Sequence, residues 1–214
     1  MTFMVSSLAQ VKPGRLEDGV AALRQGAKIV ERHGAGNVRL FRCISGEGFG
    51  RLALSMEYPS MAAWGQSYEQ QIADEEMRSL HPSMTESVLT FVSMANGTEI
   101  PLGEGIATGQ GSVILVGVAR PVPGRFEDAI AQGATFARIW QRLGAVGTRS
   151  WQLGASGSQS MSLALVTEFA GMRALGAAND QFATDAEAPE IIGQFNGVNP
   201  VSISTVDIFT AIAL

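Results

Sequence analysis

The chain has 214 residues, of which 46% are hydrophobic and 16% charged, with a formal net charge of −5. This acidic balance argues against a nucleic-acid partner, because phosphate binding needs clustered lysine and arginine side chains. The single cysteine, Cys43, excludes an intrachain disulfide and a zinc site built from thiolates. No apolar run reaches membrane-spanning length and the first residues lack a basic signal region, so we expect a cytoplasmic protein without membrane contact.

The sequence contains an internal repeat. Pro13–Asp18 recurs with one change as Pro123–Asp128, and Leu52–Leu54 recurs as Leu163–Leu165 after one inserted residue. Collinear matches of this kind indicate a duplicated structural unit. We therefore expect two similar halves, residues 1–96 and 112–214, joined by the glycine-rich segment 97–111, which has the composition of a linker.

Each half has the pattern β-α-β-β-α-β. Apolar, β-branched runs bounded by turn residues predict strands, and apolar residues at steps of three and four predict helices. A glycine after the first helix of each half, Gly34 or Gly144, suits a left-handed helix end. In the first half, strands are expected at 3–11, 38–44, 52–58 and 87–95, with helices beginning near Leu16 and Ser60. In the second half, strands at 112–120 and 202–211 and helices near Phe126 and Gly171 are the corresponding elements.

This order of elements resembles the dimeric α/β barrel superfamily. The resemblance rests on the Pro-Gly pair before each first helix and on the segment Glu57–Trp64 that follows the third strand. It implies an α+β fold in which two ferredoxin-like βαββαβ units pair sheet to sheet, here as an intramolecular pseudo-dimer, with a cavity between sheet and helices. It also leaves room for a homodimer of whole chains. Members include cofactor-free monooxygenases, haem-degrading and haem-dependent enzymes, lactone isomerases and cyclases, so the fold does not choose the function.

Strand alternation predicts which residues face the helices. Within 52–58, the side chains of Leu52, Leu54, Met56 and Tyr58 share one side of the strand. We expect this aliphatic set to face the helices, and the mixed sets, such as Arg39 and Phe41 with their counterparts Arg149 and Trp151, to face the other half. Burial of apolar surface there, at about 25 cal/mol per Å², would hold the halves together.

Arg39 and Glu57 form the most suggestive charged pair. If the hairpin between their strands turns near Gly48, they lie opposite each other, and Arg149 and Glu168 repeat the arrangement. One interpretation is an ion pair that fixes strand register or contacts between the halves. The other is catalytic, with Glu57 as proton acceptor or Arg39 as anchor for an anionic or carbonyl substrate.

His81 is the strongest single catalytic candidate. It is expected in a loop before Pro82, and the other half has no histidine, which fits a site specialised in one half. The superfamily resemblance implies that haem-degrading members use an Asn, a Trp and a His near one cavity. Trp64 and His81 would stand for the last two, while the first strand offers Ser6 and Ser7 in place of the Asn.

Three functions remain open from the sequence. The first is a small-molecule-binding protein, acting without metal or cofactor as a monooxygenase or isomerase on an apolar or aromatic compound, with Tyr58, Trp64, Tyr68 and Phe41 as pocket residues. The second is a non-catalytic binding or assembly module, which predicts a filled interior and a large exposed apolar patch. The third is a haem-binding protein.

Overall fold

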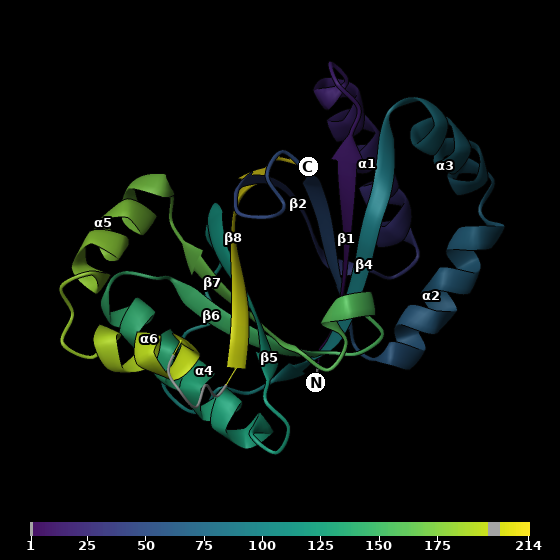
Figure 1. Cartoon of the computed structure of the whole chain (residues 1–214). Coiled ribbons are helices and arrows are strands. Elements are labelled where there is room, and N and C mark those ends of the chain that lie inside the picture. Colours follow the sequence, from purple (N-terminus) through teal and green to yellow (C-terminus); the bar gives the residue numbers. More distant parts are fainter. Residues whose placement is uncertain (1, 197–201) are drawn as a thin grey trace.

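Eight antiparallel strands close into one barrel in the computed structural model, which describes residues 2–196 and 202–214 (Figure 1). The first half comprises β1 (Phe3–Val11), α1 (Leu16–Arg32), β2 (Gly36–Ser45), β3 (Leu52–Tyr58), α2 (Met61–Ala73), α3 (Glu75–Ser87) and β4 (Leu89–Ile100). The second comprises β5 (Val113–Pro121), α4 (Phe126–Arg142), β6 (Gly147–Leu153), β7 (Leu163–Phe169), α5 (Met172–Phe182), α6 (Ala188–Asn196) and β8 (Ser202–Ile212), with a 3-10 turn at Gly157–Gln159. The predicted α+β class is confirmed.

The strand order around the barrel is β1-β3-β2-β8-β5-β7-β6-β4. The first-half strands thus run β4-β1-β3-β2 and the second-half strands β8-β5-β7-β6. Two contacts join these sets, β2 with β8 and β4 with β6. Because the ring is closed, every strand has a neighbour on both sides, which removes the exposed edges that an open sheet would present.

The helices lie outside the barrel, α1 to α3 against the first set of strands and α4 to α6 against the second (Figure 1). Helix α1 carries Glu17 and Asp18 in its first turn and Arg32 in its last, which suits the helix dipole at both ends. Gly34 and Gly144 follow α1 and α4 with φ of +95° and +108°, so both have the left-handed conformation that the sequence predicts.

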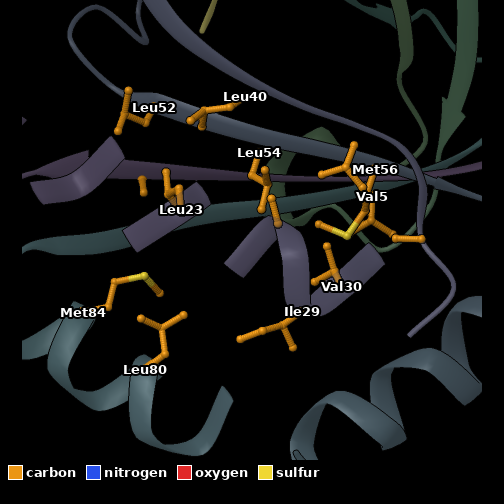
Figure 2. Close-up of a cluster of buried hydrophobic side chains, with 14 of the residues drawn as sticks. Val5, Leu23, Ile29, Val30, Leu40, Leu52, Leu54, Met56, Leu80 and Met84 are labelled. Atoms are coloured by element: carbon orange, nitrogen blue, oxygen red, sulfur yellow. The ribbon is translucent and has the colours of Figure 1, made fainter. Parts of the chain in front are cut away.

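The aliphatic side of β3 packs on the helices as strand alternation predicts. Leu52, Leu54, Met56 and Tyr58 are buried in a cluster that includes side chains of β1, β2, α1 and α3. Figure 2 shows the labelled members, among them Leu23 of α1 beside the strands. Removing one such buried leucine side chain would cost about 2–5 kcal/mol, since the transfer and cavity terms add.

Two helices, rather than one, follow β3. Helix α2 begins after Ser60, whose Oγ accepts a hydrogen bond from Ala63 N at 3.1 Å. The chain then breaks at Asp74, which is extended and caps α3 by accepting from Glu76 N and Met77 N. His81 therefore lies inside α3 and not in a loop, so that prediction was wrong.

Strand β4 continues past Ala95 to Ile100, into the segment expected to be a linker. It does so because this part of β4 pairs with strands on both sides. Thr98 of β4 lies opposite Phe3 of β1, and Ile100 of β4 lies opposite Ser150 of β6. Within the described ranges, no helix has both the length and the apolar character that crossing a membrane requires.

Candidate functional site

A pocket of about 600 Å³ lies between the first-half strands and helices α1 to α3. We call it the helix-side pocket. Its floor is formed by β1 and β3 and its other walls by α1, α2, α3 and β4. Its apolar lining includes Val5, Leu54, Met56, Leu80, Met84 and Phe91, and its polar lining is Ser7, Tyr68, Gln71, Arg78 and His81. A mostly apolar pocket of this size with few polar groups is typical of a small-molecule site.

The pocket is open because small residues of α1 lie where α4 has aromatic ones. Gly26 and Val30 line the pocket, and at the corresponding repeat positions α4 carries Phe136 and Trp140. A Cβ built on Gly26 would meet no atom within 4 Å, so the space above it is free. The signal for this pocket is present in the sequence, as glycine and valine in the first half at the positions of phenylalanine and tryptophan in the second.

In the second half the same region is filled by stacked rings. Trp140 packs against Phe182 with ring centroids 4.8 Å apart and planes nearly parallel, and against Phe136 and Phe169 at 5.7 Å, edge to face. These geometries are the favoured ones for aromatic pairs. Among the residues that the structure describes, the second half thus has packed rings at the positions where the first half has a pocket.

His81 borders the helix-side pocket from α3. Its imidazole is exposed and stacks on Phe91 of β4 with ring centroids 5.9 Å apart and an interplanar angle of 12°. Arg78 precedes it by three residues and lines the same pocket, so one imidazole and one guanidinium share a face of α3. An imidazole can act as a general base when a substrate proton lies within hydrogen-bond reach of its ring nitrogen.

The predicted pocket residues are distributed over two places. Tyr68 lines the helix-side pocket. Trp64 does not line it, and its ring makes tilted contacts with Phe3 at 5.5 Å and with Tyr68 at 6.0 Å. Tyr58 is 2% exposed, and its hydroxyl accepts from Gln71 Nε2 at 3.3 Å, so it supports the pocket from beneath Gln71.

Phe41 does not reach the helix-side pocket. It lies on the inner face of β2, lines the barrel lumen and is covered by the guanidinium of Arg39, 4.7 Å from its ring centroid. The lumen contains a separate cavity of about 170 Å³. Arg39 and Glu57 also line this lumen, so the predicted catalytic set of His81, Glu57 and Arg39 is not brought together.

The predicted cross-strand pair of Arg39 with Glu57 was wrong. Arg39 lies opposite Ser55, because the register of β2 on β3 centres the hairpin near Glu47 and not near Gly48. Glu57 lies opposite Gly36, after a one-residue register shift between Gly36 and Arg39. Asn37, inside this shift, has a φ of +44°, in the left-handed region that Asn tolerates better than most residues. Glu57 therefore lies two residues along β3 from Ser55, the register partner of Arg39.

Each of these charges instead pairs with the other half. Arg39 Nη1 donates to Glu168 Oε1 at 2.8 Å, and Arg149 Nη1 donates to Glu57 Oε1 at 2.6 Å. Arg149 Nε also donates to Glu99 Oε1 at 2.8 Å. Burial alone would raise the pKa of Glu99, but the hydrogen bond and charge of Arg149 outweigh it and lower that pKa. We call this set the lumen ion pairs, and they connect the two halves at one end of the barrel.

His33 joins the helices that cover the pocket. It follows α1, and its Nε2 lies 2.7 Å from Asp74 Oδ2 between α2 and α3. Arg32 Nη2 donates to the same oxygen at 2.8 Å. The hydrogen bond with His33, then those from Arg32 and Met77, hold the pKa of Asp74 well below its usual value. Among the residues that the structure describes, no three His, Cys, Asp or Glu side chains form a metal-binding group.

No family model matches the chain, and no curated protein matches it. Solved structures do. An anthrone oxidase-like protein matches with a TM-score of 0.65 and 12% identity over 99% of this chain and 92% of that one. A mutant chlorite dismutase from Candidatus Nitrospira defluvii, in complex with cyanide, has a TM-score of 0.60 and 10% identity, covering 99% and 91%.

A protein assigned as a monooxygenase, from Fusobacterium nucleatum, matches with a TM-score of 0.58 and 8% identity over 99% of this chain and 93% of that one. At such identities a match shows the fold and not the activity. The agreement extends over nearly the whole length of each chain, and it confirms the resemblance that the sequence suggests. The chain has the fold of the dimeric α/β barrel superfamily.

Proposed function

We propose that the chain binds a small, apolar, ring-bearing molecule in the helix-side pocket. The observation that carries this proposal is the difference between the halves, since the first has a 600 Å³ pocket where the second has stacked aromatic rings. In a purely structural module, an unfilled apolar space beneath the first-half helices would lower stability without any compensating function. The pocket thus favours ligand binding over the assembly-module alternative.

The favoured activity is oxygenation without a cofactor, with isomerisation as the related alternative. Both reactions begin when a base removes a proton from an activated C–H or phenolic O–H group of the substrate. His81 is the base, and Arg78 stabilises the resulting anion from the same face of α3. For an anthrone-type substrate, O₂ then oxidises the anionic ring carbon. One oxygen atom forms the new carbonyl, and the other leaves as water with the two hydrogens lost from that carbon.

The structural neighbours support the choice of oxygenation. One is an anthrone oxidase-like protein and another is assigned as a monooxygenase. Anthrone is a suitable probe because it is apolar, polycyclic and acidic at one ring carbon. Its conversion to the quinone changes its absorbance and consumes O₂.

The experiment measures O₂ uptake and quinone formation with anthrone above the uncatalysed rate, with no added metal or cofactor. His81→Ala should lower the catalysed rate by about 10²–10⁴-fold, the usual contribution of a general base, while anthrone still binds. Lys28→Ala, at an exposed residue of α1 that does not line the pocket, is the control for retained activity. Full activity in His81→Ala would exclude this role for His81, and absence of anthrone binding to the native chain would exclude the pocket proposal.

Haem is the second candidate ligand, and the composition of the pocket favours it. The pocket brings one imidazole, His81, and one guanidinium, Arg78, to an otherwise apolar wall. His81 would hold the iron and Arg78 would pair with a propionate, and bound haem would supply redox chemistry that the side chains lack. A Soret shift that is lost in His81→Ala and kept in Lys28→Ala is the expected result. No shift on adding haem to the native chain would exclude this candidate.

We further propose that the chain is a pseudo-dimer of two repeats, residues 1–96 and 112–214, joined through 97–111. The strand orders β4-β1-β3-β2 and β8-β5-β7-β6 support this organisation, since they match element for element. The exchange of ion pairs between the halves supports it as well, because Arg39 and Arg149 each contact the glutamate of the other half. Association of two chains remains a prediction.

A further inference from the structure

The barrel lumen contains a second cavity that is separate from the helix-side pocket. It measures about 170 Å³ and is lined by inward-facing residues of the strands. The two cavities share no lining residue, because successive side chains of a strand point to opposite faces of the sheet. At one end, the lumen ion pairs of Arg39 with Glu168 and Arg149 with Glu57 span the interior.

The walls of this cavity differ in polarity. Ser6 of β1 and Ser55 of β3 are register partners and line one side. Their counterparts in the second half, Val116 of β5 and Val166 of β7, are also register partners and line the cavity. Strands β1 and β5 lie opposite each other in the ring, and so do β3 and β7. A pair of hydroxyl-bearing residues therefore faces a pair of valines across the cavity.

Trp151 of β6 provides a buried donor without an acceptor. The residue is 5% exposed and lines the cavity, and within the described part of the chain its Nε1 has no hydrogen-bond partner. The ring is held in place by the guanidinium of Arg149, which lies 4.8 Å from its centroid. The corresponding residue of the first half is Phe41, which carries no donor. An unpaired buried N–H is unfavourable, and an acceptor in the cavity would relieve it.

We infer that the barrel lumen binds a neutral, single-ring molecule that carries one acceptor oxygen, such as an aryl ketone. An apolar cavity of about 150 Å³ is known to hold benzene, so this space suits one ring with a small substituent. The ring packs against Val116 and Val166, and the oxygen accepts from Trp151 Nε1–H. An anionic ligand does not fit, because the arginines at the end of the lumen, Arg39 and Arg149, already pair with glutamates.

The test compares acetophenone with ethylbenzene, which has nearly the same shape and no acceptor. Calorimetric titration of the full chain should show acetophenone binding about three- to tenfold more tightly, the usual worth of one hydrogen bond. Trp151→Phe reproduces the residue of the first half, and it should lower acetophenone affinity to that of ethylbenzene while leaving ethylbenzene unchanged. Equal acetophenone affinity in Trp151→Phe, or no binding of either compound to the native chain, would overturn the inference.

Two further measurements separate this site from the helix-side pocket. Gly26→Phe fills the helix-side pocket and should leave acetophenone affinity unchanged, so a loss there would overturn the inference. Indole N–H resonances of the native chain provide a readout that does not depend on a variant folding. Acetophenone should shift the Trp151 resonance and leave those of Trp64 and Trp140 in place, and a shift of Trp64 or Trp140 without Trp151 would contradict the assignment.

Discussion

Arg149 of β6 and Glu57 of β3 hydrogen-bond at 2.6 Å although β1 and β4 lie between their strands in the barrel. Arg149→Met should therefore leave two partly buried carboxylates, Glu57 and Glu99, without their counter-charge. We expect a loss of roughly 2–4 kcal/mol in the free energy of unfolding at pH 7, measured by urea denaturation. Arg120→Met, at an exposed arginine, is the control and should change stability little.

The cost of Arg149→Met should depend on pH in a defined direction. Arg149 lowers the pKa of Glu99 in the folded chain, from an ordinary value of 4.5. A carboxyl with a lowered folded pKa stabilises the fold above its unfolded pKa and loses that contribution as pH falls through the folded value. The difference between native and variant should thus be full at pH 7 and shrink below about pH 4.5. A difference that is constant across this range would contradict the assignment.

Asp74 should control both stability and the shape of the helix-side pocket. Asp74→Ala removes the cap of α3 and the contacts to His33 and Arg32, so we expect Tm to fall by roughly a few degrees at pH 7. Because the pKa of Asp74 is lowered in the fold, the difference in Tm should narrow as pH falls below the unfolded value of 3.8.

The counterpart of Asp74 in the second half supplies a matched control. Asp185 accepts from Arg142 and from Glu187 N, so Asp185→Ala should lower Tm similarly. It lies away from the helix-side pocket, and anthrone affinity should fall only in Asp74→Ala. Equal loss of affinity in both variants would show that a general loss of stability is responsible.

The order of elements was readable from the sequence because each signal is local. The break at Asp74 was also signalled, by an Asp followed by Glu75 and Glu76 at a helix start, and this capping pattern was overlooked. The register shift next to Asn37 could not be predicted with the same ease. It depends on how β2 meets strands from both halves, and local propensity carries no information about that contact.

The site was harder to predict than the fold. His81 and Tyr68 were expected near a pocket and border one. Pattern alone could not show that Phe41 faces the lumen cavity rather than the helix-side pocket, because both sides of the sheet are buried. The exchange of ion-pair partners between halves likewise follows only from the closed ring of strands.

Trp140→Ala combined with Phe136→Gly, the residue that the first half has at that position, should open a second helix-side pocket in the second half. The tryptophan is 4% exposed and packs on three phenylalanine rings, so its removal should cost about 3–5 kcal/mol. Its Nε1 has no partner within the described residues, which places the cost at the lower end of that range. Calorimetric titration with anthrone should show a second equivalent of ligand bound. A stoichiometry that stays at one would contradict the view that aromatic filling distinguishes the halves.

The most direct measurement is the anthrone affinity of Gly26→Phe beside that of Gly26→Ala. The alanine variant adds one methyl group into free space and should bind anthrone as the native chain does, with helix α1 stabilised by up to about 1 kcal/mol. The phenylalanine variant places a ring where α4 has one and should abolish anthrone binding while the chain stays folded. Unchanged anthrone affinity in folded Gly26→Phe would contradict the assignment of the ligand to the helix-side pocket.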